Sequence, residues 1–464
     1  MGSQQTRELA HTDLSDLAVS TNDKFSNDIC LHIFSFINSE AEFQDFIKSY
    51  SKVCRQWRVI ILQFCGLKTQ IWASSTKDLK SKTSNGMLKY CFIQSITINN
   101  SQLKGGDISG ITTGLYSAKL KELNINYNQL DDKSMSIISS SLPSLEVLKA
   151  RGNSIKDKGL MLIAQSENLK QLKVLDVYAN NFSSEGVLSI CSSPNMKNLT
   201  ELNLGYCEIG AEGAKAIVNA FKLKKLEIFS GRIGNEGLIA IANSPNMADL
   251  QLLNVEYNYI GEEGALALVN TEYVKNLTKL DISSNEIGST AGNALVGSEI
   301  LKHIKSLKLG SCGIDQAGAK TLANNPFIKN LTSLGLQNNV IGPEGACALG
   351  QSEYLQNLRR LNLHANKPAI CDTGLLGLAS ENDETGSNLF RLEVLEIGLN
   401  LIGDVGIKAF AKLSFPALKT LDLSYNDFTD AGDTLLKSSI FMMNTNVKTF
   451  DCRNLSSFQP RVCH

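Results

Sequence analysis

A short apolar pattern recurs through most of this 464-residue chain and constrains its fold more than any other feature. Written L-x-x-L-x-L-x-x-N-x-I, the pattern is complete in the copies that begin at Leu277 and Leu331. Eight of the thirteen intervals between successive starts are 27 residues long. A period of this length predicts a solenoid, in which each repeat stacks only on its neighbours. The starts are Ile93, Leu120, Leu145, Leu172, Leu199, Leu223, Leu250, Leu277, Ile304, Leu331, Leu358, Leu392, Leu418 and Val447.

Each repeat has room for one strand and one helix. The L-x-L piece alternates with a period of two, which predicts a short strand with one face turned inward. A glycine recurs fourteen residues after the start, often behind an acidic residue, and apolar residues follow it at helical spacing. We therefore predict an α/β fold over residues 93–464: a curved β-α solenoid of about 13–14 repeats, with strands on the concave side.

An asparagine recurs at the ninth position of the repeat. Its amide both donates and accepts hydrogen bonds, so it can satisfy backbone groups where the strand ends. Cys207 and Cys312 take this position in two copies, and we interpret them as small buried members of the same ladder, not as reactive thiols. The predicted ladder is Asn128, Asn153, Asn180, Cys207, Asn258, Asn285, Cys312, Asn339, Asn366, Asn400 and Asn426.

Side chains four, six and seven residues after each start are expected on the concave face. Aromatic residues and arginine dominate protein interfaces, and several of them fall at these positions in successive repeats. We therefore predict a protein target on this face. The alternative is that rings on neighbouring strands pack together and only shield the sheet. The predicted target-binding residues are Arg151, Asp176, Tyr178, Tyr206, Glu227, Phe229, Glu256 and Tyr257.

The chain before the repeats divides into three parts. Residues 1–22 are polar, and we expect a disordered tail. Residues 23–66 have apolar side chains at helical spacing, which predicts a small all-α module of three helices. Residues 67–92 are interpreted as a connector or a partial first repeat.

Two resemblances follow from these patterns. The repeats resemble the ribonuclease-inhibitor-like class of leucine-rich repeats. The segment from Phe25 to Ile37, followed by Val53-Cys54-Arg55-Gln56-Trp57-Arg58, resembles an F-box. That resemblance implies a Skp-type adaptor of a cullin-RING ubiquitin ligase as a partner. The alternative is an apolar helical cap that seals the first repeat. The implied adaptor-binding residues are Phe25, Ile29, Ile33, Phe34, Phe36, Val53, Cys54, Trp57 and Ile60.

The composition argues against several classes of function. Lys plus Arg is 45 and Asp plus Glu is 46, so the net charge of −1 gives no electrostatic case for nucleic acid. No apolar run is long enough for a transmembrane segment. The five histidines have no partner at metal or nucleophile spacing, so we predict no catalytic residue, metal or cofactor.

Eleven cysteines without a C-x-x-C pair indicate reduced thiols and a cytoplasmic protein, with a nuclear location left open. The first six residues also fit the N-myristoylation pattern at Gly2.

These observations favour a non-enzymatic substrate-recognition subunit of a Skp-cullin-F-box ubiquitin ligase, monomeric outside its complex. Two alternatives stay open. One is a scaffold or inhibitor of the ribonuclease-inhibitor type without an F-box. The other is a regulator that resembles the Ran GTPase-activating proteins, which share this repeat class.

Overall fold

The computed structural model of the protein describes residues 69–72, 93–112, 117–378, 388–411, 415–439 and 446–448. The chain divides into two compact units, and nearly all of these residues belong to the second, Gln70–Lys80 with Gln94–His464. The predicted tail, the all-α module of residues 23–66, its nine implied adaptor-binding residues and Gly2 lie outside the described residues. They stay predictions.

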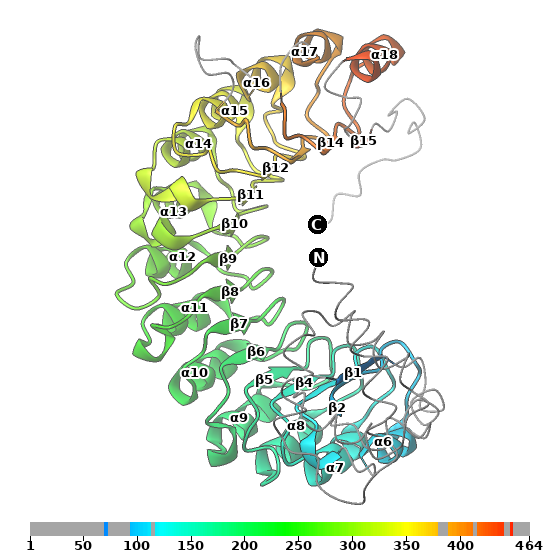
Figure 1. The fold of residues 1–464 in the computed structure, drawn as a ribbon. Helices are drawn as coiled ribbons and strands as arrows, with labels where there is room; N and C mark the ends of the chain where they lie inside the picture. The colour runs from blue at the N-terminus through cyan, green and yellow to red at the C-terminus, as the bar shows by residue number, and fades with distance from the viewer. Residues whose placement is uncertain are drawn as a thin grey trace, which may run out of the picture. The chain divides into compact units, whose positions relative to one another are not determined.

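The described strands form one sheet of fifteen strands whose spatial order follows the chain (Figure 1). From β2 onward each strand pairs in parallel with the next, and Leu280 lies level with Leu253 and Leu307 in the neighbouring strands. The predicted α/β solenoid is confirmed. The strands are β1 (Thr69–Trp72), β2 (Ile93–Thr97), β3 (Glu122–Asn124), β4 (Val147–Lys149), β5 (Val174–Asp176), β6 (Glu201–Asn203), β7 (Lys225–Glu227), β8 (Leu252–Asn254), β9 (Lys279–Asp281), β10 (Ser306–Lys308), β11 (Ser333–Gly335), β12 (Arg360–Asn362), β13 (Val394–Glu396), β14 (Thr420–Asp422) and β15 (Asn446–Lys448).

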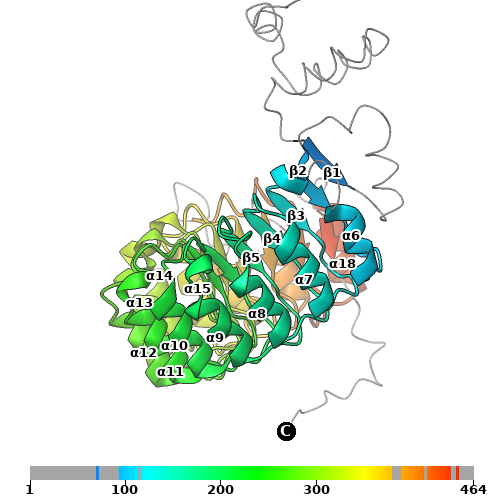
Figure 2. The ribbon, with the colours of Figure 1, turned by 90° about the horizontal axis from the view of Figure 1, so that it is seen from below.

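Among the described residues, the helices lie on one face of this sheet and none lies on the other, which we call the open face (Figures 1 and 2). Short 3-10 turns precede several strands: η2 (Ser117–Lys119), η3 (Pro194–Met196), η4 (Pro245–Met247), η5 (Glu299–His303) and η6 (Pro326–Asn330). The α-helices are α6 (Gly105–Thr112), α7 (Asp132–Ser141), α8 (Asp157–Gln165), α9 (Ser184–Ser192), α10 (Gly210–Ala220), α11 (Gly234–Ala242), α12 (Glu262–Val269), α13 (Gly288–Gly297), α14 (Gln316–Ala323), α15 (Gly342–Gln351), α16 (Cys371–Leu378), α17 (Asp404–Phe410) and α18 (Asp430–Ser438).

The core lies between the sheet and the helices. The middle residue of each short strand, such as Leu280, is buried together with the apolar residue two positions later, such as Ile282. The recurring helix glycine lets adjacent helices approach closely. A Cβ atom at Gly237 would lie 2.6 Å from Cβ of Ile233 and 3.2 Å from Cβ of Ala214 on α10. A larger residue there would force the two helices apart.

The asparagine side chains join one repeat to the next. The Asn285 amide donates to the carbonyl oxygens of Val255 (2.9 Å) and Ile282 (2.8 Å). Its Oδ1 accepts from the backbone N–H groups of Asn258 (2.9 Å) and Ile260 (3.0 Å) in the preceding repeat. Since most buried backbone groups require a partner, this side chain closes the turn that follows the strand.

The two cysteines at the ladder position are buried and also bond backbone carbonyls. Cys312 Sγ donates to Ile282 O at 3.3 Å, and Cys207 Sγ donates to Asn180 O at 3.5 Å. Burial raises the pKa of each thiol to about 12, so both are neutral at physiological pH. Gly231 takes the same position in the repeat that begins at Leu223, where it has no side chain to contribute to the ladder.

The register of the last strand corrects one predicted start. Val447 was expected to begin a repeat, but it pairs with Leu421, the fourth residue of the repeat that begins at Leu418. The last repeat therefore begins three residues earlier. That first position is polar, since Asn444 occupies it, so the apolar pattern was aligned on the wrong residue.

Candidate binding surface

The open face of the sheet has a row of aromatic rings, which we call the aromatic strip: Tyr178, Tyr206, Phe229 and Tyr257. Ring centroids of Tyr178 and Tyr206 lie 5.3 Å apart in an edge-to-face arrangement. Tyr206 and Phe229 lie 4.7 Å apart, and Phe229 and Tyr257 lie 6.0 Å apart. The rings therefore do pack across the ladder, as the shielding alternative expected.

Packing does not remove the strip from solvent. Tyr206 is 54% exposed and Tyr257 is 57% exposed, while Tyr178 and Phe229 are half-buried. An exposed row of contiguous rings on an open sheet is typical of an interaction surface.

The backbone at two of these tyrosines is in the left-handed region, with φ 58° at Tyr206 and 62° at Tyr257. Gly152 (φ 59°) and Asn338 (φ 54°) take the same position in other repeats. Glycine and asparagine adopt this conformation readily, whereas a bulky L-residue is less favourable there by about 1 kcal/mol. Other repeats place Ala179, Leu399 or Tyr425 there, so the turn accepts side chains of any size at this modest cost.

An ion pair borders the strip on the β4 side. Arg151 Nε lies 2.5 Å from Asp176 Oδ2, and the guanidinium carbon lies 5.7 Å from the Tyr178 ring centroid. Asp176 is only 5% exposed, and this burial raises its pKa although the Arg151 charge acts in the opposite direction. Partial burial would lower the pKa of Arg151, but Asp176 raises it overall, so the guanidinium stays charged.

A second ion pair borders the strip on the β10 side, where Lys308 Nζ lies 3.0 Å from Asp281 Oδ2. Glu227 and Glu256 lie between the two ion pairs and are half-buried. Among the described residues neither of these carboxylates has an ion pair within 4.0 Å. Burial raises the pKa of both carboxyls. Arg151 opposes the shift of Glu227 and Asp176 adds to it, whereas Asp281 adds to the shift of Glu256 and Lys308 opposes it.

All eight predicted target-binding residues lie on this open face, on β5 and β7 or in the turns just after β4–β8. The structure brings them into one patch. The prediction omitted Tyr127, whose ring covers Gly152 and which is 50% exposed. Tyr127 is seven residues after Leu120, so the position rule that selected Tyr206 would also have found it.

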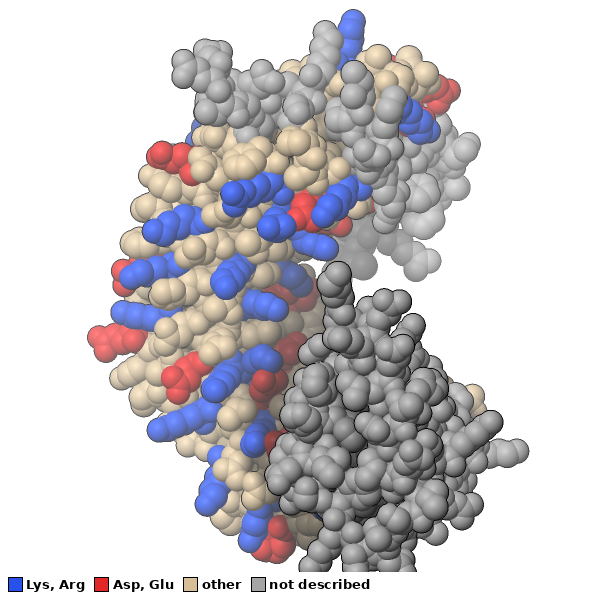
Figure 3. All heavy atoms as spheres, in the orientation of Figure 1, with Lys and Arg blue, Asp and Glu red and all other residues tan. Residues whose placement is uncertain are grey.

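The rims of the solenoid differ in charge. The helices all run in one direction, and acidic side chains in their first turns face the partial positive charge of the helix N-termini. Exposed basic side chains gather on the other rim, where helices end and strands begin, and Figure 3 shows Lys and Arg predominating there. The acidic residues in the first helical turns are Asp132, Asp157, Glu185, Glu212, Glu236, Glu262, Glu263, Glu344, Asp372, Asp404 and Asp430. The basic residues include Lys170, Lys173, Lys197, Lys222, Lys224, Lys275, Lys302, Lys305, Lys329, Arg359 and Lys419.

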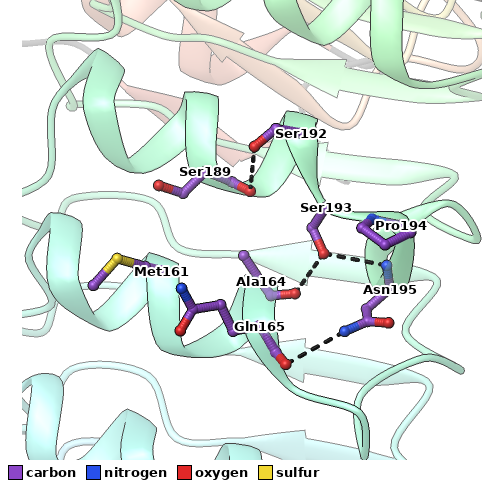
Figure 4. A pocket seen from close by; sticks show the side chains of 8 residues that line it. All are labelled: Met161, Ala164, Gln165, Ser189, Ser192, Ser193, Pro194 and Asn195. Carbon is purple, nitrogen blue, oxygen red and sulfur yellow. Dashed lines mark hydrogen bonds between the residues drawn. The ribbon is translucent and has the colours of Figure 1, made fainter.

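The helix side has a shallow hollow of about 400 Å³ near the ends of α8 and α9 (Figure 4). Its polar groups already bond one another: Ser193 Oγ donates to Ala164 O at 2.5 Å, and the Asn195 amide donates to Gln165 O at 3.3 Å. No charged side chain lines it. The hollow is a seam between two repeats and gives no chemical reason for a ligand.

Within the part of the chain that the structure describes, no group of three His, Cys, Asp or Glu side chains could hold a metal ion. The same residues include no helix with the length and apolar character needed to cross a bilayer. His364 lies on the open face against Gly398, and Asn362 Oδ1 accepts a hydrogen bond from its backbone N–H at 2.9 Å.

A family model described as Leucine Rich repeat matches residues 116–139, 195–218, 219–242, 275–296, 301–323, 328–350, 391–411 and 416–432. These segments are leucine-rich repeats. Each contains a predicted repeat start, and the described strands between them belong to the same sheet. No curated protein matches the chain.

Solved structures with this architecture are distant in sequence. A chain of the yeast Rad7 and Elc1 complex is 14% identical with a TM-score of 0.52, and the alignment covers 92% of this chain and 98% of that one. An internalin (inlF) from Listeria monocytogenes is 20% identical with a TM-score of 0.47, covering 86% and 94%. At such identities the Rad7–Elc1 likeness shows a shared leucine-rich-repeat fold and nothing about activity.

Proposed function

We propose that the protein recognises a protein target on the open face of its leucine-rich repeats. The observation that carries this proposal is the aromatic strip, because its rings form a contiguous row in which Tyr206 and Tyr257 stay 54% and 57% exposed. Tyrosine buries a large area with few rotatable bonds, which suits it to the centre of an interface.

We further propose that the target is presented for ubiquitination, with the F-box-like module of residues 23–66 bound to a Skp-type adaptor of a cullin-RING ligase. The module would dock the ligase while the strip holds the target, so the protein acts by raising the effective concentration of one near the other. The Rad7 structure offers a limited parallel, since it was solved as a complex with a second protein, Elc1.

A scaffold or inhibitor of the ribonuclease-inhibitor type is the second candidate. The strip and its flanking ion pairs lie entirely within the repeats from Leu145 to Ile304 and need no residue before them. Target binding would then be the whole function.

Co-purification of the full chain with a Skp-type adaptor separates the two candidates. Under the ligase proposal the adaptor co-elutes with the wild type and with Tyr206→Asn, but not with Trp57→Ala. Absence of the adaptor from the wild-type complex, with an unchanged set of target proteins after Trp57→Ala, would favour the scaffold.

A further inference from the structure

The charges around the aromatic strip do not balance. Two cations, Arg151 and Lys308, face four carboxylates: Asp176, Glu227, Glu256 and Asp281. Two further cations nearby, Lys149 and Lys225, are each balanced by a bonded acid, Glu122 and Glu201. The sum of +2 and −4 leaves this part of the face at −2, although the whole chain carries only −1. Each cation bonds one of the two outer carboxylates, which leaves the excess negative charge at the centre.

The two central carboxylates are close to the rings in sequence. Glu227 ends β7 two residues before Phe229, and Glu256 directly precedes Tyr257. The two rings are 6.0 Å apart, so the acids flank the middle of the strip. Lys308 acts on both carboxylates and Arg151 acts on Glu227, yet the short contacts of these two cations are with Asp281 and Asp176.

Half-buried carboxylates beside aromatic faces favour a cation. A carboxylate removed from water is stabilised by an opposite charge, and the face of an aromatic ring attracts an ammonium or guanidinium group as well. Arg151 over Tyr178, bonded to Asp176, shows the same arrangement at one end of this surface. At the centre the described residues supply the acids and the rings, while the nearest cations, Arg151, Lys225 and Lys308, each bond another carboxylate.

We propose that the target inserts an arginine or lysine side chain, from a segment that is otherwise apolar, between Glu227 and Glu256 on the Phe229–Tyr257 part of the strip. This inference rests on the proposed function and specifies its partner. The charge of −2 favours a basic segment over an acidic one, and the rings accommodate its apolar neighbours.

The test selects peptides without assuming the target. A random peptide library is panned against the immobilised full chain, and each selected peptide is then measured on the wild type and on three variants. Tyr206→Asn with Tyr257→Asn removes two rings of the strip. Glu227→Gln with Glu256→Gln removes the two charges while keeping size and hydrogen bonding. Glu396→Gln is the matched control, because Glu396 ends β13 as Glu227 ends β7 but lies far along the solenoid.

We expect selected peptides to have Arg or Lys next to apolar residues and to bind the Glu227→Gln, Glu256→Gln double variant at least about 10-fold more weakly, with no change on Glu396→Gln. Peptides that depend on the tyrosines but are acidic or uncharged, or that bind the double glutamine variant equally well, would overturn the inference and leave the proposed function standing. Selected peptides that are indifferent to the tyrosine substitutions would overturn both.

Discussion

Replacing Asn285 by alanine is the most direct test of how the repeats are held together. The wild-type side chain makes five hydrogen bonds to backbone groups. Two of the three carbonyls keep another donor, since Ser283 O accepts from Tyr257 N–H and Ile282 O accepts from the Cys312 thiol. Three buried groups would lose the partner that the structure shows: Val255 O and the N–H groups of Asn258 and Ile260.

The magnitude follows from those three groups. A buried polar group without a partner costs about 1–3 kcal/mol, so the three together give about 3–9 kcal/mol. Partial relaxation and water entry favour the lower half, and we expect a loss of about 3–5 kcal/mol.

Asn285→Cys is expected to lose less, about 2–3 kcal/mol, because a thiol at this ladder position can still donate to Val255 O, as the Cys312 thiol donates to Ile282 O one repeat later. Asn276→Ala is the surface control, since its amide bonds Ala248 O at 2.9 Å in an exposed position, and its loss should stay below about 1 kcal/mol.

Urea unfolding and amide hydrogen exchange together provide the assay, because a long repeat array can unfold in parts and a single transition then misses a local effect. Protection of the Asn258 and Ile260 amides should fall most in Asn285→Ala. The reasoning would be refuted if that variant kept wild-type protection, or if the cysteine variant were destabilised as much as the alanine variant.

Four further outcomes follow from the same contacts. Tyr206→Asn should change the free energy of unfolding by less than about 1 kcal/mol, because relief of the left-handed backbone offsets the lost ring contact, yet it should reduce target capture. Glu227→Gln should raise the thermal midpoint at pH 7 or leave it unchanged. The pKa of Glu227 is raised in the fold, so its ionised form opposes folding above that pKa, and the difference should vanish at pH values where both states are protonated. Gly350→Ala should destabilise by about 1–3 kcal/mol in a urea titration, since its Cβ would collide with the backbone of Leu378. Cys312 should resist alkylation at pH 8 in the native protein and react once it is unfolded, because its pKa is about 12 in the fold.

Two of these outcomes have a further check. Gly106→Ala on α6 meets no atom within 4 Å, so it should be neutral or slightly stabilising where Gly350→Ala is not. The raised thiol pKa also predicts that the folded protein becomes less stable at alkaline pH. The stability that neutral Cys312 contributes is complete below the unfolded pKa near 9 and is lost as the pH rises from there toward 12. Equal urea midpoints at pH 8 and pH 11 would contradict this reasoning.

The repeat starts could be predicted because spacing alone reveals them. A buried leucine every 27 residues leaves a periodic signal, and the parallel register of Leu253, Leu280 and Leu307 follows from it. The same rule failed at Val447, where a polar residue opens the repeat, and at Gly231, where a glycine replaces the ladder asparagine. In both places the sequence of one repeat departs from the pattern, but its backbone follows the same path as in the other repeats.

The candidate surface was predictable in its location but not in its chemistry. Counting four, six and seven residues from each start brought Tyr178, Tyr206, Phe229 and Tyr257 onto one face. Sequence position alone does not reveal that Tyr206 is half exposed and has a left-handed backbone. Both properties depend on how the turn after each strand packs against the turn of the next repeat.

The sequence by itself determined the period, the strand register and the side of the sheet that each residue occupies, because these depend on local spacing that repeats. It also determined the net charge of −1. Only the tertiary structure decided how the charges are distributed. Arg151 meets Asp176 across 25 residues of chain, Lys308 meets Asp281, and Glu227 and Glu256 are left without an ion pair of their own among the described residues. Ion pairing between repeats depends on whether side chains on adjacent strands can reach one another. As a result, a chain with almost no net charge has two charged rims and an excess of negative charge beside the exposed rings.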